Sequence, residues 1–135
     1  MNASTELPGR TQMTLLQKKL EQFVEANSDI RGAVISTVDG FEVASQLDSS
    51  LSAAKLAAMT SSLLALSGAI ARESLLGSSR DMVIDADKGR LLLMEVPTTE
   101  KRLLLAVLCD NQVTLGQVLW AVNAFRDGLA RDNSG

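Results

Sequence analysis

Few residues in this chain could carry out chemistry, and the commonest of them are missing. The 135 residues include no His and a single Cys, Cys109. Without His the chain cannot form a Ser–His or Cys–His catalytic pair, and it cannot supply most zinc sites. Cys109 also has no partner for an internal disulfide. We therefore expect no catalytic residue, no metal site and no cofactor site.

The acidic residues are the next candidates. Glu42, Asp81 and Asp85 could come together as carboxylates, but solvated strand ends and turns explain them as well. The segment 85–89 resembles the start of a calcium loop, yet its glycine comes one residue early and no bidentate Glu closes the loop. A plain hairpin turn is the better interpretation. No P-loop sequence is present, so the chain is not itself a P-loop nucleotide hydrolase.

The charge balance argues against nucleic acid as a partner. The chain has 13 Lys+Arg and 16 Asp+Glu, a net charge of −3, and it carries one Trp, three Phe and no Tyr. Binding to a phosphate backbone needs a basic patch, and binding to single strands needs stacking rings. Each arginine taken singly is best interpreted as a solvated charge. The candidates for contact with a phosphate-bearing partner are Arg31, Arg72, Arg80, Arg90, Arg102 and Arg126.

Hydrophobic periodicity indicates the helices and strands that would position these residues. Two capping boxes, Thr14–Gln17 and Thr114–Gln117, are expected to start the first and last helices. Asp39-Gly40 tolerates positive φ at both central positions of a tight turn, so it is the strongest hairpin signal. The expected helices are 14–26, 50–73 and 114–129, and the expected strands are 30–37, 41–46, 80–86, 89–96 and 102–109. Strands 30–37 and 102–109 are apolar on both faces, which requires helices on both sides of the sheet.

The helix at 50–73 has two dissimilar faces. At 100° per residue its large apolar residues fall on one side, and small residues fall on the other with almost no charge. We expect the small side to let the same helix of a second copy approach closely, giving a two-fold symmetric dimer in which the third strand extends the sheet. The alternative is that both faces are buried within one domain. The large residues are Leu56, Met59, Leu63, Leu66 and Ile70, and the predicted dimer interface is Ala54, Ala58, Ser61, Ala65, Gly68, Ala69, Met82 and Ile84.

Trp120 falls opposite the apolar stripe of the last helix. It either lies against the first helix with its N–H in water, or it is an exposed anchor for a partner, since Trp is enriched at binding hot spots. Lys55, Arg72 and Trp120 are the predicted partner contacts.

Several segments resemble one family. The stretch 30–45, Ile-Arg-Gly-Ala-Val-Ile-Ser-Thr-Val-Asp-Gly-Phe-Glu-Val-Ala-Ser, resembles the opening hairpin of the roadblock family of dynein light chains. The Ala/Ser/Leu-rich helix, the strands 89–96 and 103–109, and the helix start at Leu115-Gly116 match in order. The resemblance covers about residues 13–129 and includes no catalytic signature.

This resemblance implies a profilin-like α/β sandwich in the order α-β-β-α-β-β-β-α. Its five-stranded antiparallel sheet would carry the second helix on one face and the other two helices on the opposite face. Members typically pair through the second helix and third strand. Roadblock proteins of bacterial type bind Ras-like small GTPases and regulate GTP hydrolysis, and eukaryotic relatives serve as dynein light chains or scaffold subunits. The short single-domain form looks more like the bacterial type, so a non-enzymatic homodimeric regulator of a small GTPase is expected.

The remaining expectations concern the ends of the chain and the rival functions. Residues 1–12 are expected to form a flexible tail, 13–131 a single domain and 132–135 a second tail. No signal peptide is apparent, and no apolar stretch approaches ~20 residues, so a cytoplasmic protein without membrane insertion is expected. The rivals are a dimeric scaffold without effect on nucleotide turnover, and a small-molecule sensor, which needs an internal cavity with converging polar groups.

Overall fold

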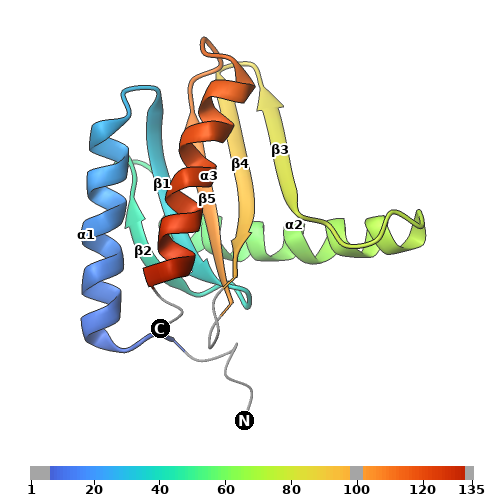
Figure 1. Ribbon diagram of the computed structural model, residues 1–135, viewed down its shortest axis with the longest axis horizontal. Coiled ribbons are helices and arrows are strands. Elements are labelled where there is room, and N and C mark those ends of the chain that lie inside the picture. The colour runs from blue at the N-terminus through green and yellow to red at the C-terminus, as the bar shows by residue number, and fades with distance from the viewer. Residues whose placement is uncertain (1–6, 98–101, 133–135) are drawn as a thin grey trace.

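The computed structural model describes residues 7–97 and 102–132. Three helices and five strands follow one another in the expected order, α-β-β-α-β-β-β-α (Figure 1). Their bounds are α1 (Arg10–Ala26), β1 (Ile30–Thr37), β2 (Glu42–Gln46), α2 (Ala53–Glu73), β3 (Asp81–Ala86), β4 (Gly89–Val96), β5 (Leu103–Cys109) and α3 (Leu115–Asp132).

The strands form one antiparallel sheet in the order β2-β1-β5-β4-β3, with α1 and α3 on one face and α2 on the other (Figure 1). The central strand β5 shows why both faces need helices. Leu103, Leu105 and Val107 lie in the core under α1 and α3, whereas Leu104 and Ala106 lie in the smaller core under α2. The prediction of a strand buried on both faces is confirmed, and with it the arrangement of layers.

The first helix begins earlier than predicted. It starts at Arg10, with Gly9 as the N-cap residue, so residues 10–12 are helical and do not belong to a tail. Thr14 does not cap the helix, because its hydroxyl donates back to the carbonyl of Arg10 within the first turn. Gln17 is used elsewhere, since its amide bonds to the backbone of Ser45 in β2. Residues 1–6 and 133–135, most of the predicted tails, lie outside the described residues.

The caps of the other two helices come from side chains. Ser52 accepts from the Lys55 N–H at the start of α2, and Thr114 accepts from the Gln117 N–H before α3, as the second capping box predicts. Asp48, four residues before Ser52, is used in the turn that precedes α2. The Asp48 carboxylate accepts from the backbone and the side chain of Ser50, and these bonds lower the pKa of Asp48.

The hairpin between β1 and β2 is present, but its turn differs in type. In this turn Gly40 has a positive φ of +96°, whereas Asp39, the other central residue of the predicted tight turn, does not. The Gly40 N–H donates to the Thr37 carbonyl and the Thr37 N–H donates to the Phe41 carbonyl, the pattern of a three-residue loop with a glycine bulge. Glycine also gives α2 room, because a Cβ at position 40 would lie 3.3 Å from Ala58 Cα. The turn and the helix therefore depend on small residues at their contact.

Candidate functional site

The helix α2 presents a different face to the sheet from the one that its large residues suggest. Its fully buried residues are Ala57 and Thr60. Met59 is 66% exposed, Leu66 58% and Ile70 54%. The large stripe of the helix is therefore not a continuous core side, because these three of its members are exposed. The side that packs on the sheet is of mixed size. Beside Ala57 and Thr60, the partly buried Leu63 and Leu64 pack against the smaller core under α2.

The predicted small-residue interface divides in two. Ala54, Ala58, Ala65 and Ala69 are exposed, as a contact with a second copy requires. Ser61 and Gly68 are partly buried by their own chain. The Ser61 hydroxyl donates to the Val38 carbonyl at the β1–β2 turn. The Arg72 guanidinium lies over Gly68, where a Cβ would come 3.3 Å from its Nη1.

Those contacts also show which way each flank of α2 points. Ser61, Ala65 and Gly68 line a hollow together with Val38, Glu95 and Arg102, at the end of the sheet that carries the β1–β2 turn. The flank with Met59 and Ile70 is on the opposite side of the helix at 100° per residue. It therefore faces the other half of the sheet.

That other half is not covered by a helix of the described residues. In Figure 1, α2 crosses the sheet near the turn end and its second half extends past β3. A hollow of about 620 Å³ lies beyond it on the same face, with Ile84, Leu91 and Leu108 in its lining and Arg31 and Arg90 among its polar residues. Ile84 of β3 is 44% exposed and Met82 is partly buried.

The exposed apolar residues of the molecule gather in the same region. Among the described residues, twelve large apolar side chains are exposed, and eight of them belong to α2, to its flanking segments or to β3: Leu51, Met59, Leu66, Ile70, Leu75, Leu76, Val83 and Ile84. A monomer rarely leaves such a set in water unless a partner covers it. We name the α2 flank with Met59, Leu66 and Ile70, together with β3, the apolar face.

By length and composition, α2 also qualifies as a membrane-spanning helix, contrary to the expectation that no segment of the chain approaches that length. It has 21 residues, and its most apolar window has a mean hydropathy of 1.4 and is 11% buried. The core helix of a folded domain can pass the same test, so on its own the result is a weak indication of a membrane.

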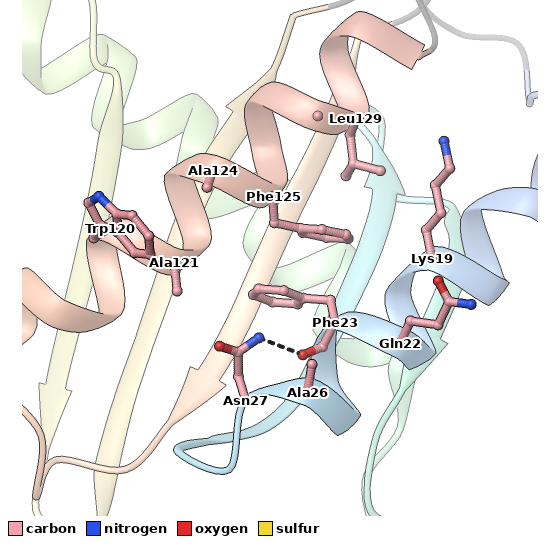
Figure 2. Close-up of a pocket in the computed structure, with 11 residues that line it drawn as sticks. Lys19, Gln22, Phe23, Ala26, Asn27, Trp120, Ala121, Ala124, Phe125 and Leu129 are labelled. Atoms are coloured by element: carbon pink, nitrogen blue, oxygen red, sulfur yellow. Dashed lines mark hydrogen bonds between the residues drawn. The ribbon is translucent and has the colours of Figure 1, made fainter.

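A second candidate surface lies on the opposite side of the sheet, between α1 and α3. The groove has a volume of about 570 Å³ and is lined by residues of both helices, and Figure 2 shows Phe23 and Phe125 pointing toward each other between them. Phe23 and Phe125 stack at its floor with ring centroids 4.1 Å apart. Trp120 stands at one end and is 78% exposed, so α1 does not cover it. Of the two interpretations of Trp120, the structure favours the exposed one.

The exposure of Trp120 leads to a direct prediction. Since Trp120 is the single Trp of the chain, its fluorescence reports on this groove alone. We expect emission at the wavelength of a hydrated indole, and the Trp120→Ala variant should keep the free energy of unfolding within about 0.5 kcal/mol, because the ring packs little. Fluorescence spectra and urea titrations check both. Blue-shifted emission from the free protein would contradict the exposed position.

The charged candidates fall into two groups. Four arginines are paired: Arg31 with Asp110, Arg90 with Asp85, Arg102 with Glu95 and Arg126 with Asp81. The hydrogen bond to Glu95 raises the pKa of Arg102, which stays charged. Within residues 7–97 and 102–132, Lys55, Arg72 and Arg80 have no such pair. The two predicted partner contacts of this kind, Lys55 and Arg72, are thus exposed on α2 and available.

The chemical candidates do not form a site in the described part of the chain. Asp85 and Arg90 flank a tight hairpin in which Ala86 pairs with Gly89, so the hairpin interpretation is confirmed. Gly89 is needed for a close approach, because a Cβ there would lie 2.7 Å from the Cys109 carbonyl. Glu42 lies in β2, on the other edge of the sheet from Asp81 and Asp85 in β3, so the three carboxylates do not come together. Burial raises the pKa of the Cys109 thiol. No group of three metal-ligating side chains occurs among the described residues.

Solved structures show the same fold. Myxococcus xanthus MglB is 16% identical with a TM-score of 0.79, over 93% of this chain and 92% of its own. A structure described as MglB with tetrameric arrangement is 19% identical with a TM-score of 0.78, over 96% and 95%. Acanthamoeba castellanii profilin IB is 12% identical with a TM-score of 0.62, over 86% and 97%. The predicted profilin-like sandwich is confirmed.

The sequence itself identifies the family. No curated protein matches it. The family model of the Roadblock/LC7 domain matches residues 16–108, which run from the first turns of α1 through β5. This chain is a member of the Roadblock/LC7 domain family.

Proposed function

We propose that this protein is a homodimeric regulator that binds a Ras-like small GTPase and modulates its GTP hydrolysis in the cytoplasm. It acts as a binding protein and not as an enzyme, in keeping with a sequence that has no His and one buried Cys. The observation that carries the proposal is the apolar face, together with the uncovered half of the sheet beside it.

The two features complement each other under two-fold symmetry. An axis through the β3 edge, perpendicular to the sheet, brings the protruding half of the partner's α2 over the uncovered half of this sheet. At 1.5 Å per residue, Leu66–Glu73 spans about 12 Å, enough to cross two or three strands about 4.8 Å apart. The hollow lined by Ile84, Leu91 and Leu108 is at that position. In the same arrangement the β3 strands pair antiparallel, which makes one sheet of two subunits.

This arrangement revises the predicted contact. The two α2 helices approach each other through the flank that carries Met59, Leu66 and Ile70, so these residues and Ile84 form the centre of the proposed interface. The alanines at 54, 58, 65 and 69 lie on the outer flank. The proposed dimer still forms through α2 and β3, as predicted. Its contacts are made by the large apolar side chains of α2 and not by the small ones.

The GTPase part of the proposal is supported by the family and by surface that the dimer leaves free. Structures of MglB resemble this chain, and the bacterial type of roadblock protein is the type that the sequence resembles. Two exposed charges, Lys55 and Arg72, lie on α2 outside the core of the proposed dimer. The exposed ring of Trp120 lies on α3, also outside that core. A small GTPase has switch loops whose order is easily biased, so a docked dimer could change turnover without contributing a catalytic group.

The decisive experiment uses the native host. Small GTPases encoded near this protein would be co-purified with the tagged full chain, and GTP turnover by each bound GTPase would be measured with and without it. We expect binding and a change in turnover of at least about tenfold, well below the roughly 10³-fold or more that a supplied arginine finger gives. A GTPase that binds with unchanged turnover would support the dimeric scaffold instead. Failure of every GTPase to bind would refute the proposal.

A further inference from the structure

The two edges of the sheet are treated differently by the rest of the chain. The edge strands are β2 and β3. At β2, the Gln17 side chain of α1 binds the backbone of Ser45 twice. Its Oε1 accepts from the Ser45 N–H at 2.9 Å, and its Nε2 donates to the Ser45 carbonyl at 2.7 Å. A neighbouring antiparallel strand would make the same two bonds with one of its residues.

A third bond holds the amide in this orientation. Gln17 Nε2 also donates to the Glu21 carboxylate at 2.8 Å, one helical turn further along α1. Because a carboxylate only accepts, this bond directs the amide nitrogen toward Glu21 and leaves the amide oxygen for the Ser45 N–H. Ser45 lies opposite Val34 in the ladder. Because its N–H and carbonyl both bond to Gln17 of α1, they point away from β1. Gln17 therefore occupies outward-facing bonding positions of a strand that has five residues.

Residues 7–97 and 102–132 provide no comparable cover for the β3 edge. Within the described residues, the side-chain hydrogen bond to its backbone is the one from Asn111 to the Ala86 carbonyl, at the last residue of the strand. Val83 and Ile84 in the middle of β3 are 40% and 44% exposed. An uncovered edge is a template for another strand.

We infer that Gln17 is an edge-blocking residue, which closes β2 to strand pairing so that sheets of separate molecules join only through β3. A two-fold contact through β3 is complete after two copies. A second open edge would let such pairs add end to end without limit. The β3 half of this statement rests on the proposed function, and the β2 half does not.

The test compares self-assembly of the full chain with and without the side-chain amide of Gln17. Light scattering after size exclusion would be recorded over a concentration series for the wild type, Gln17→Ala and Gln22→Ala. Gln22 is a matched control, a glutamine exposed on the same helix. We expect the weight-average mass of Gln17→Ala to grow with concentration to at least twice the wild-type value, and that of Gln22→Ala to stay unchanged. A wild-type protein that is monomeric would refute the β3 dimer and leave this comparison valid.

A second variant separates edge blocking from a merely stabilising role. Ser45→Pro removes the outward N–H, and proline is tolerated on edge strands at such positions. Added to Gln17→Ala, it should return the mass to the wild-type value. A Gln17→Ala protein that melts at a lower temperature but keeps the wild-type mass would overturn the inference.

A measurement on the unmodified protein guards against a variant that does not fold. Amide hydrogen exchange at Ser45 should be at least tenfold slower than at an exposed amide, because Gln17 holds the N–H. Exchange at the rate of an exposed amide would also overturn the inference.

Discussion

Replacing Leu66 by Glu should convert the protein into a monomer. Leu66 lies on the apolar face and is 58% exposed in the single chain, so the substitution should be tolerated within one subunit. In the dimer it would place an unpaired carboxylate in an apolar contact, which costs several kcal/mol. The symmetry repeats that cost in the second subunit, so we expect the dissociation constant to rise by at least about 100-fold. Sedimentation velocity over a concentration series measures it.

The chain offers matched controls for this variant. Leu15 on α1 is also an exposed leucine, at 48%, and lies on the far side of the sheet, so Leu15→Glu should leave the dimer intact. Ala65→Glu tests the alternative contact, because Ala65 belongs to the small-residue flank. Monomers from Ala65→Glu and dimers from Leu66→Glu would reverse the assignment of the two flanks. Dimers from both variants would reject α2 as the contact.

Replacing Leu105 by Ala should cause a large loss of stability. Leu105 is fully buried in the central strand, paired with Ile35 of β1 and Met94 of β4, under the two-helix face. Truncating a buried leucine removes its transfer free energy and leaves a cavity, about 2–5 kcal/mol together. That is a large part of the roughly 5–15 kcal/mol that holds a typical domain folded.

Urea unfolding at one fixed protein concentration measures this loss, since dimerisation adds a concentration-dependent term to the apparent stability. Leu15→Ala is the control, because an exposed leucine should change the free energy of unfolding by less than about 0.5 kcal/mol. A loss below about 1 kcal/mol for Leu105→Ala would mean that the core around β5 repacks freely, contrary to its dense apolar contacts.

The groove between α1 and α3 raises a separate question about ligands. The sensor hypothesis requires an internal cavity with converging polar groups. The hollows on both faces of the sheet are surface grooves, and the one beside Trp120 is lined mainly by apolar side chains over a Phe23–Phe125 stack. Trp120 fluorescence would reveal any small molecule that enters it. The structure favours protein contacts over a buried ligand.

The elements could be predicted closely because local signals agree with the global fold. The bounds of β1 and β4 match the prediction, and α2, β2, β3 and β5 differ from it at their starts by one to three residues. The predicted start of α1 is wrong. A Thr followed three residues later by Gln has the form of a capping box, but position 9 is a glycine that caps without any side-chain signal. The pattern assigns Gln17 to that box, whereas its partner in the fold, Ser45, is 28 residues away.

The sequence by itself determined the order of elements and the need for helices on both faces, because periodicity and turn residues act over a few neighbouring positions. It also determined the family, through its match to the Roadblock/LC7 pattern over residues 16–108. The tertiary structure alone decided which face of α2 is buried. A helix of Ala, Ser and Leu has two plausible core sides, and the choice between them is made by contacts with segments distant in the chain, such as the close approach of Gly40 to Ala58. It also decided that β3 is the open edge while Gln17 closes β2. Contacts between segments distant in the chain leave no periodic signal in either segment, so they appear only when the chain is folded.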